Sequence, residues 1–526
     1  MALNSNQFLL ALSFLIVAFG APSLSWGLSM AASAFGYALF WKVALTSENR
    51  FWLGSIWFAA IQGVQLNWLA TTHYMGPLIL VVYVLLAIVL GLQFGLLTFL
   101  GNGSMTWRQI FGLSGFWVLM EWSRLFFFSG FTWNPIGLSL AASDYSIQFA
   151  SVFGIYGLCF WVILTNLALL KSKRIWLFLA LFPYLFGFFH QFMWEQKIGE
   201  GKKLSVALVQ TAIKPEERDP INGQKHKHLH PLVQWERILT FLKEKETMHY
   251  DLIVLPEGSL PAGAKQAIYP LSKVKKIWSA FGVPEAFPLI ESSYATNLFW
   301  LQSLSNHFES AVIAGLDDHE NGKIYNAAFY FTPHEQKVNR YEKQILIPIG
   351  EYIPFKPLAR FFAEQFGIHG SFTSGSRTKV FQGVIPIGVF ICLEETYSHL
   401  VRNSRKEGAE LFVNITNDVW FPGTRLPWLH LDHGRIRAAE NGVYLLRSCN
   451  TGVTAVVDCF GKVESTFPVS DTIGGVLSTA IQTRSYPTLY TLWGDLPILI
   501  LSLGLFFSEI IQRIVKKKLL GIRLLG

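Results

Sequence analysis

Long apolar runs fill the first 193 residues of the chain and return once near its C-terminus. A helix needs about 20 apolar residues to cross a bilayer hydrocarbon core of about 30 Å. Runs of roughly this length lie at residues 7–21, 24–41, 51–70, 77–100, 110–128, 147–170, 174–193 and near 488–510. The pattern therefore predicts a multi-helix transmembrane bundle of about eight helices, seven of which precede a long polar insert.

The insert has a different pattern, because short apolar runs alternate with polar or helical stretches. Runs rich in Val, Ile and Leu lie at residues 204–210, 251–257, 311–316, 326–331, 385–392, 410–416, 443–448 and 454–458. Such runs are typical of strands buried on both faces of an α/β sheet. Residues 430–442 predict a helix that ends at Gly442. We therefore expect membrane helices over 1–193, an α/β domain over 194–487, and a last membrane helix with a basic tail over 488–526.

The positions of Lys and Arg predict how these parts face the membrane. Basic residues flank alternate loops and the C-terminus: Lys42, Arg50, Arg108, Lys171, Lys173, Arg174, Arg513, Lys516, Lys517, Lys518 and Arg523. The loops near 71–76 and 129–146 contain neither Lys nor Arg. Under the positive-inside rule both termini are cytoplasmic, and seven helices then deliver the insert to the opposite side.

Composition excludes a nucleic-acid partner. The chain is 51% hydrophobic and 15% charged, which is typical of a membrane protein with a soluble part. Its formal net charge is +8, but the basic residues lie at the ends of predicted membrane segments and not in runs interleaved with aromatic residues. We therefore expect the chain to be surrounded by membrane lipid and not bound to nucleic acid.

The Cys and His patterns predict no metal site. The four cysteines are Cys159, Cys392, Cys449 and Cys459, and no CxxC pair occurs. Cys449 and Cys459 could form a disulfide outside the cytoplasm, although two buried free thiols are the favoured interpretation. An HxHxH run, formed by His226, His228 and His230, has Lys225 and Lys227 beside these histidines and is interpreted as a solvated loop. No glycine-rich phosphate loop occurs, and no cofactor is expected.

Three short segments carry reactive side chains where strand-like runs end. They are Glu257 in DLIVLPEGSLP, Lys343 in VNRYEKQILIPIGEYIPF, and Cys392 in IPIGVFICLEETY. A thiol is only slightly ionised near neutral pH, so Cys392 needs a base, and Glu257 enclosed among apolar groups would be one. Lys343 would stabilise the negative oxygen formed when a thiolate adds to a carbonyl. Singly, these residues are better explained as a buried thiol, a turn carboxylate and a solvated lysine, so only their combination indicates cysteine chemistry.

The three segments, in this chain order, resemble the nitrilase superfamily and its Glu-Lys-Cys triad. NITNDVWFPG (414–423) and RIRAAENGVYLLRSCNTGVTAVVDCFGK (435–462) also follow the pattern that the family has after its cysteine. The resemblance covers about residues 200–460. It implies a nitrilase-like αββα sandwich in which Glu257 is the general base, Lys343 stabilises the transition state and Cys392 is the nucleophile.

Together with the flanking helices, the chain resembles the apolipoprotein N-acyltransferase family. Glu351 lies eight residues after Lys343 and Glu394 lies two after Cys392, as in that family, and TLYTLWGDLP leads into the last helix. Leu393 departs from the aromatic residue common after the nucleophile, and the 421–423 loop is longer than a common WFG. These departures leave the acyl-chain contacts and the shape of that loop open.

This resemblance implies a ping-pong acyl transfer without a cofactor. Cys392 would take a fatty acyl chain from a phospholipid as a thioester. The α-amino group of the N-terminal diacylglyceryl-cysteine of an apolipoprotein would then accept the chain as an amide. The implied location is the bacterial cell inner membrane, with a periplasmic catalytic domain. Glu351 is expected to hold Lys343 or the substrate amine, and Glu394 to orient the backbone at Cys392.

Asn326 and Trp420 are weaker candidates for the lining of the substrate pocket. The main enzymatic alternative is a membrane-tethered nitrilase-type amidase with water as acceptor. A transporter or receptor with an inactive external domain is a third class, which the intact triad disfavours. In the predicted fifth helix, Glu121 and Arg124 are either functional intramembrane charges or an intrahelical ion pair, and the ion pair is favoured.

Overall fold

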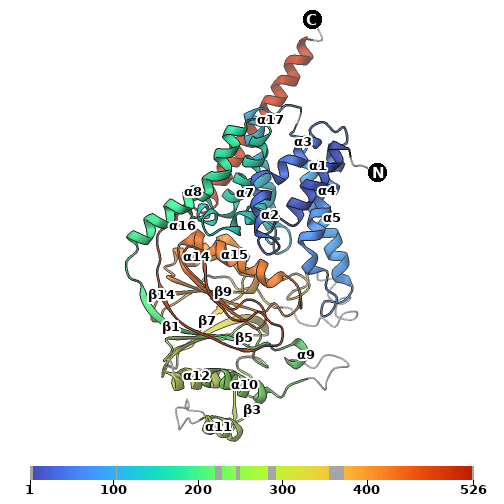
Figure 1. Ribbon diagram of the computed structural model, residues 1–526. Coiled ribbons are helices and arrows are strands. Elements are labelled where there is room, and N and C mark those ends of the chain that lie inside the picture. Colours follow the sequence, from blue (N-terminus) through green and yellow to red (C-terminus); the bar gives the residue numbers. More distant parts are fainter. Residues whose placement is uncertain are drawn as a thin grey trace. The chain divides into compact units, whose positions relative to one another are not determined.

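The computed structural model in Figure 1 describes residues 4–101, 103–218, 228–244, 249–281, 292–354 and 372–523. Contacts between residues divide the chain into two units. One is helical, Met1–Lys197 with Pro487–Gly526, and the other is an α/β unit, Ile198–Tyr486. His226 of the HxHxH run and Phe355 at the end of the Lys343 segment lie outside the described residues.

A helix forms at every apolar run that the sequence analysis assigned to the membrane. These helices are α1 (Ser5–Ala18), α2 (Trp26–Ala31), α3 (Tyr37–Ala44), α4 (Arg50–Gln65), α5 (Leu78–Leu97), α6 (Trp107–Ser123), α7 (Ala150–Leu169), α8 (Lys173–Lys197) and α17 (Leu496–Arg523), with a short α16 (Leu489–Trp493). A π-helical turn, Ala32–Gly36, joins α2 to α3, so the expected span 24–41 is not one regular α-helix.

Four helical stretches in the described part of the chain are long and apolar enough to cross a membrane. They are Leu78–Leu97, Ser146–Leu169, Lys173–Lys197 and Leu496–Lys516. Apolar side chains such as Val81, Leu85 and Val89 of α5 are exposed. A surface of this kind is typical of a helix that faces lipid. The apolar helical region is thus confirmed, whereas the count of about eight spans stays a prediction.

The expected loop 129–146 contains more ordered structure than a simple connection. Residues Ile136–Ala142 and Ser146–Phe149 form 3-10 turns, and most of their side chains are buried. Glu121 accepts a hydrogen bond of 3.0 Å from the backbone N–H of Ile136. It also lies 3.7 Å from Arg124, as the favoured ion-pair interpretation predicted. A buried loop needs internal partners for its polar backbone, and Glu121 supplies one.

The α/β unit contains two six-stranded sheets and a small β3–β4 pair in the described residues. The first sheet has the order β14-β1-β2-β5-β6-β7 and the second β13-β12-β11-β10-β9-β8. The strands are β1 (Lys202–Gln210), β2 (Leu252–Val254), β3 (Tyr269–Pro270), β4 (Tyr294–Ala295), β5 (Ala311–Glu320), β6 (Lys323–Phe331), β7 (Asn339–Glu342), β8 (Val380–Phe381), β9 (Ile387–Ile391), β10 (Leu411–Thr416), β11 (Tyr444–Cys449), β12 (Ala455–Val457), β13 (Val463–Thr466) and β14 (Gly475–Thr483).

The central strands β1, β2 and β5 run parallel, as do β9, β10 and β11. Each of the eight predicted strands forms. The predicted strands do not include β3, β4, β7, β8, β13 or β14. The longest of these is β14, which pairs antiparallel with β1 at the sheet edge. It was missed because its burial is mixed, since Ser478, Thr479 and Gln482 interrupt the apolar run.

Helices cover the outer face of each sheet, which gives the predicted αββα layers (Figure 1). On the first sheet lie α10 (Pro231–Lys243) and α12 (Asn297–Phe308), and on the second α14 (Ser398–Lys406) and α15 (Leu426–Asn441). Helix α11 (Leu271–Ala280) contacts the small β3–β4 pair. Trp235 and Trp300 stack with ring centroids 4.9 Å apart in the first helix–sheet core. Between the sheets, the Ser448 hydroxyl lies 2.8 and 3.0 Å from the carbonyls of Val209 and Val254.

Two local predictions in this unit are also confirmed. Helix α15 ends at Gly442, which has a φ of 61° and provides the left-handed C-cap that favours glycine. Cys449 and Cys459 are buried free thiols, as are Cys159 and Cys392.

Candidate active site

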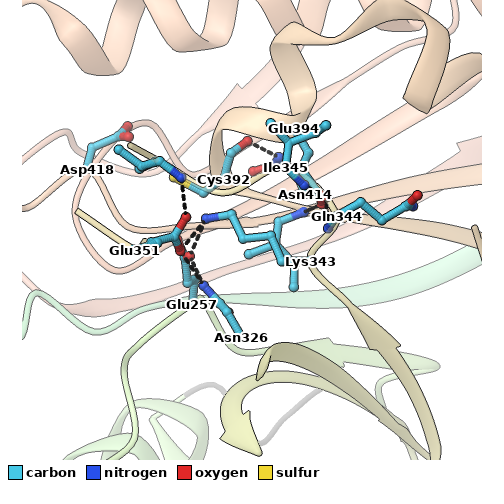
Figure 2. A network of polar contacts seen from close by, with 12 residues as sticks. Glu257, Asn326, Lys343, Gln344, Ile345, Glu351, Cys392, Glu394, Asn414 and Asp418 are labelled. Carbon is cyan, nitrogen blue, oxygen red and sulfur yellow. Dashed lines mark hydrogen bonds and ion pairs between the residues drawn. The ribbon is translucent and has the colours of Figure 1, made fainter. Parts of the chain in front are cut away.

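Glu257, Lys343 and Cys392 lie together at strand ends, where Figure 2 shows Cys392 beside the Lys343 amine and the acidic side chains. Glu257 follows β2, Lys343 directly follows β7, and Cys392 directly follows β9. The backbone N–H of Lys343 donates to the Asn326 carbonyl at 2.8 Å. Because the strands are fixed in two packed sheets, their ends bring three segments that are distant in sequence to one place.

The Lys343 amine is buried between two carboxylates. Its Nζ lies 3.1 Å from Glu257 Oε1 and 2.8 Å from Glu351 Oε1, and its side chain is 1% exposed. Asn326 Nδ2 donates to the same two oxygens, at 2.7 Å to Glu257 and 3.0 Å to Glu351. A buried ammonium is tolerated where carboxylates compensate its charge, and these contacts fix the position of the amine. Glu351 and Asn326, predicted beside the triad, are thus part of one cluster with it.

The loop after Lys343 folds back and places Glu351 over the amine. Glu351 Oε2 accepts a hydrogen bond of 2.9 Å from the backbone N–H of Ile347. Ile349 adopts a φ of 69° in the same turn. A β-branched residue rarely takes this conformation, so the turn is strained, and strain of this kind is often found at functional sites.

Cys392 directly follows β9 and is the first residue of a 3-10 turn, Cys392–Thr396. The chain bends sharply at this residue. Its φ is 53°, a left-handed conformation that costs a non-glycine residue free energy. Two donors hold its carbonyl oxygen: Asn414 Nδ2 at 3.1 Å and His430 Nε2 at 3.1 Å. The side chain is 8% exposed. A strained strand-to-helix turn presents a nucleophile in a fixed direction.

Glu394 links the cysteine turn to the Lys343 segment. Its Oε2 accepts from the N–H of Ile391 at 2.8 Å, and its Oε1 accepts from the N–H of Gln344 at 2.6 Å and of Ile345 at 3.2 Å. The hydroxyl of Tyr341 lies 3.0 Å from both oxygens. Glu394 therefore accepts hydrogen bonds from the backbone on both sides of the site, and its role in orienting that backbone stays a prediction. Burial raises the pKa of Glu394 to about 7.

Burial and mutual charge set the protonation of the three central groups. Burial raises the pKa of Glu257, and the Lys343 ammonium opposes that rise. Burial would lower the pKa of Lys343, but the Glu257 and Glu351 carboxylates outweigh it and hold that pKa well above its usual value. Burial and the Glu257 carboxylate raise the pKa of the Cys392 thiol. The resting site thus has a protonated thiol beside a carboxyl group with increased proton affinity, and a permanent cation.

Trp420 is far more exposed than the members of this cluster. It follows β10 on a loop, and its side chain is 42% exposed. Its predicted contact with substrate therefore stays a prediction.

Sequence reasoning missed a second group of polar residues, which lies behind the Cys392 turn. Asp418, Glu395, Arg447 and His430 are all buried, with exposed fractions of 4% or less. Arg447 pairs with Glu395 at 3.0 Å, and His430 lies 3.1 Å from Asp418 and 3.3 Å from Glu395. The signal that could have revealed this group is Arg447 inside the apolar run VYLLRS, because a charge in a buried strand needs buried partners.

Comparison with known proteins gives matches along nearly the whole chain. A family model described as carbon-nitrogen hydrolase matches residues 205–486, and one described as the apolipoprotein N-acyltransferase N-terminal domain matches residues 8–168. An apolipoprotein N-acyltransferase of Chlamydia caviae is 32% identical over 93% of this chain and 94% of its own. That of Chlamydia pneumoniae is 31% identical over 94% and 95%, and that of Shewanella oneidensis is 29% identical over 78% and 75%.

Among solved structures, a CN-hydrolase superfamily protein from Xanthomonas campestris is similar to part of the chain. It is 17% identical, with a TM-score of 0.36, and the match covers 53% of this chain and 91% of that one.

Proposed function

The chain belongs to the apolipoprotein N-acyltransferase family, and from that premise we propose that it acylates lipoproteins in two steps through a thioester on Cys392. It is an acyltransferase of lipoprotein maturation whose catalytic part is a carbon-nitrogen hydrolase domain. The observation that carries the two-step course is the Lys343 amine, held between Glu257 and Glu351 beside the strained Cys392 turn.

In the first step, Glu257 accepts the thiol proton while Cys392 Sγ attacks the ester carbonyl of a phospholipid. The new C–S bond leaves a negative charge on the carbonyl oxygen, and the Lys343 ammonium stabilises it. The ester C–O bond then breaks, and the departing glycerol oxygen takes the proton from Glu257. The products are an acyl thioester on Cys392 and a lysophospholipid. The raised pKa of Glu257 supports a group that both accepts and returns a proton.

In the second step, the α-amino nitrogen of a diacylglyceryl-cysteine attacks the thioester carbonyl. Glu257 accepts a proton from that nitrogen, and Lys343 again stabilises the oxyanion. The C–S bond breaks as the sulfur regains its proton from Glu257, so that the acyl chain remains on the lipoprotein as an amide. This transfer completes the cycle, and the free thiol of Cys392 is ready for another phospholipid.

We assign the helical parts, 1–193 and 488–526, to the bacterial inner membrane with about eight spans, and residues 194–487 to the periplasmic side. The four long apolar helices and the Lys/Arg distribution of the loops support this topology. Both substrates carry acyl chains, so a membrane location brings them to the enzyme.

The topology leads to a direct prediction. A reporter that is active only outside the cytoplasm, fused after residue 300 of the full-length gene, should be active, and one fused in the loop near residue 48 should not. The reason is that an odd number of spans separates the two positions. Activity at residue 48 with none at residue 300 would contradict the orientation, and fusions in the loop near residue 74 provide a control for the external side.

The thioester itself can be trapped. Purified enzyme in detergent with phospholipid and no acceptor should gain the mass of one acyl chain, and peptide mapping should locate it on Cys392. Hydroxylamine should remove the chain, because it cleaves thioesters. Addition of a synthetic diacylglyceryl-cysteine peptide should then convert the adduct to an N-acylated peptide.

The same experiment separates the alternatives. Release of free fatty acid at the same rate with and without the peptide would favour an amidase-type enzyme with water as acceptor. Absence of any adduct, with phospholipid unchanged, would favour an inactive external domain and contradict the proposed course.

A further inference from the structure

We propose that His430 is a positioning residue for acyl transfer. Its imidazolium holds the Cys392 carbonyl and thereby strengthens the backbone N–H of Leu393 as a donor to the oxyanion. The inference rests on the proposed function, since it concerns the same negatively charged intermediate. It draws on the buried polar group behind the Cys392 turn, to which the two-step course above assigns no role.

The contacts of the ring determine where its protons are. His430 Nε2 lies 3.1 Å from the carbonyl oxygen of Cys392. A carbonyl oxygen only accepts hydrogen bonds, so Nε2 carries a hydrogen. His430 Nδ1 lies 3.1 Å from Asp418 Oδ1, and a carboxylate is also only an acceptor, so Nδ1 carries a hydrogen too. The ring that satisfies both contacts with an ionised Asp418 is a cation.

The buried group is electrically balanced in this state. Asp418 and Glu395 bring two negative charges, and Arg447 brings one positive charge through contacts of 3.1 and 3.0 Å with Glu395. The imidazolium compensates the remaining negative charge, since His430 Nε2 also lies 3.3 Å from Glu395 Oε2. The side chain of His430 has no exposed surface. An uncompensated charge would be costly at such depth, whereas a balanced group is stable.

The held carbonyl belongs to the peptide group that joins Cys392 to Leu393. Asn414 and His430 both donate to its oxygen, at 3.1 Å each. Withdrawing electron density at the oxygen of an amide makes its N–H a stronger donor, because hydrogen bonds in a chain polarise one another. The first N–H groups of a helical turn have no partner within the turn, and the turn Cys392–Thr396 begins at this peptide.

The Leu393 N–H is thereby fixed and polarised beside the nucleophile, where the residue after a strand-to-helix nucleophile provides an oxyanion donor. Lys343 supplies the charge on one side of the developing oxyanion, and Leu393 supplies a backbone donor. His430 acts through that peptide and does not contact substrate. Its contribution is expected to be smaller than that of a direct donor, whose loss costs about 10²–10³ in rate.

The test compares His430→Leu with His430→Gln in the full-length enzyme. The rate of thioester formation is measured in single turnovers with a phospholipid that carries a ¹³C-labelled acyl carbonyl. We expect about a tenfold slower acylation in His430→Leu, with the KM for phospholipid unchanged. His430→Gln should recover part of the rate, because its amide can donate one hydrogen bond to the Cys392 carbonyl.

Infrared difference spectra of the trapped thioester provide a readout that a purely structural role would not move. The labelled carbonyl band should lie at higher wavenumber in His430→Leu than in the wild type, because a weaker donor polarises the C=O bond less. His433→Gln is the matched control, since His433 is also a buried imidazole of α15. It should leave the band and the acylation rate near their wild-type values.

An unchanged band and rate in a folded His430→Leu enzyme would overturn the inference. If that variant does not fold, Asp418→Asn serves instead. It keeps the imidazole in place but removes the carboxylate that holds its second proton, and it should shift the rate and the band in the same directions. Failure of the proposed function is distinguishable, because the wild-type enzyme would then form no thioester at all.

Discussion

Cys392→Ser is expected to lower the rate of acyl transfer by about 10⁴-fold or more, while membrane insertion and folding stay near normal. Serine adds no bulk at a site where the side chain is only 8% exposed, and it tolerates a φ of 53° no worse than cysteine does. The loss arises because a hydroxyl is far less acidic than a thiol, so a carboxylate base cannot activate it effectively. The measurement is N-acylation of a diacylglyceryl-cysteine peptide by purified enzyme, with thermal unfolding measured in parallel.

Cys449→Ser provides the matched control for this substitution. Cys449 is also a buried free thiol in the second sheet, and its Sγ donates to the Val453 carbonyl at 3.3 Å. A serine hydroxyl can make the same hydrogen bond, so this variant should retain activity within a fewfold. Retained N-acylation in Cys392→Ser would refute the assignment of the nucleophile, and equal losses in both variants would indicate a structural effect.

The sequence was sufficient to predict the strands that precede Glu257 and Cys392, for a physical reason. The runs that end at Glu257 and Cys392 are continuous apolar segments, and buried parallel strands are the elements that produce such runs. β14 was missed because its outer position in the sheet mixes polar and apolar side chains, as Thr479 shows. The π-helical turn at Ala32–Gly36 is invisible in an apolar run, because hydropathy records length and not hydrogen-bond register.

The proximity of Glu257, Lys343 and Cys392 could be expected because local motifs carry them, but the pairing of charges across the sheets could not. Glu395, Asp418, His430 and Arg447 are separated by up to 52 positions, and their proximity depends on packing of β10, β11 and α15 against the Cys392 turn. The sequence offers no signal for the contacts of His430, since a histidine on a helix has no spacing pattern that predicts a hydrogen bond to a carbonyl. The sequence likewise does not reveal that Asn326 donates to both carboxylates.

Glu257→Gln is expected to slow thioester formation by about 10³-fold, the usual contribution of a positioned general base. Glutamine matches glutamate in size and can still accept from Asn326, whose Nδ2 lies 2.7 Å from Glu257 Oε1. Lys343 keeps Glu351 at 2.8 Å as a carboxylate partner, so its ammonium remains compensated. What the substitution removes is the group that takes the thiol proton. Because the thiol has a raised pKa, little thiolate forms without that group.

The pH dependence of acylation identifies Glu257 more specifically than the loss of rate. Burial raises the pKa of Glu257 above the usual carboxyl value, so this base becomes protonated, and the rate falls, at a higher pH than an exposed carboxylate would require. In Glu257→Gln the residual rate should no longer fall over this pH range. Glu320→Gln is the control, because Glu320 of β5 pairs with Arg340 of β7 at 2.7 Å, and this variant should keep both the rate and its fall at low pH. If the rate of Glu257→Gln still fell at low pH as in the wild type, the base would be another carboxylate. Glu351, which shares Lys343 with Glu257, would be the next residue to substitute.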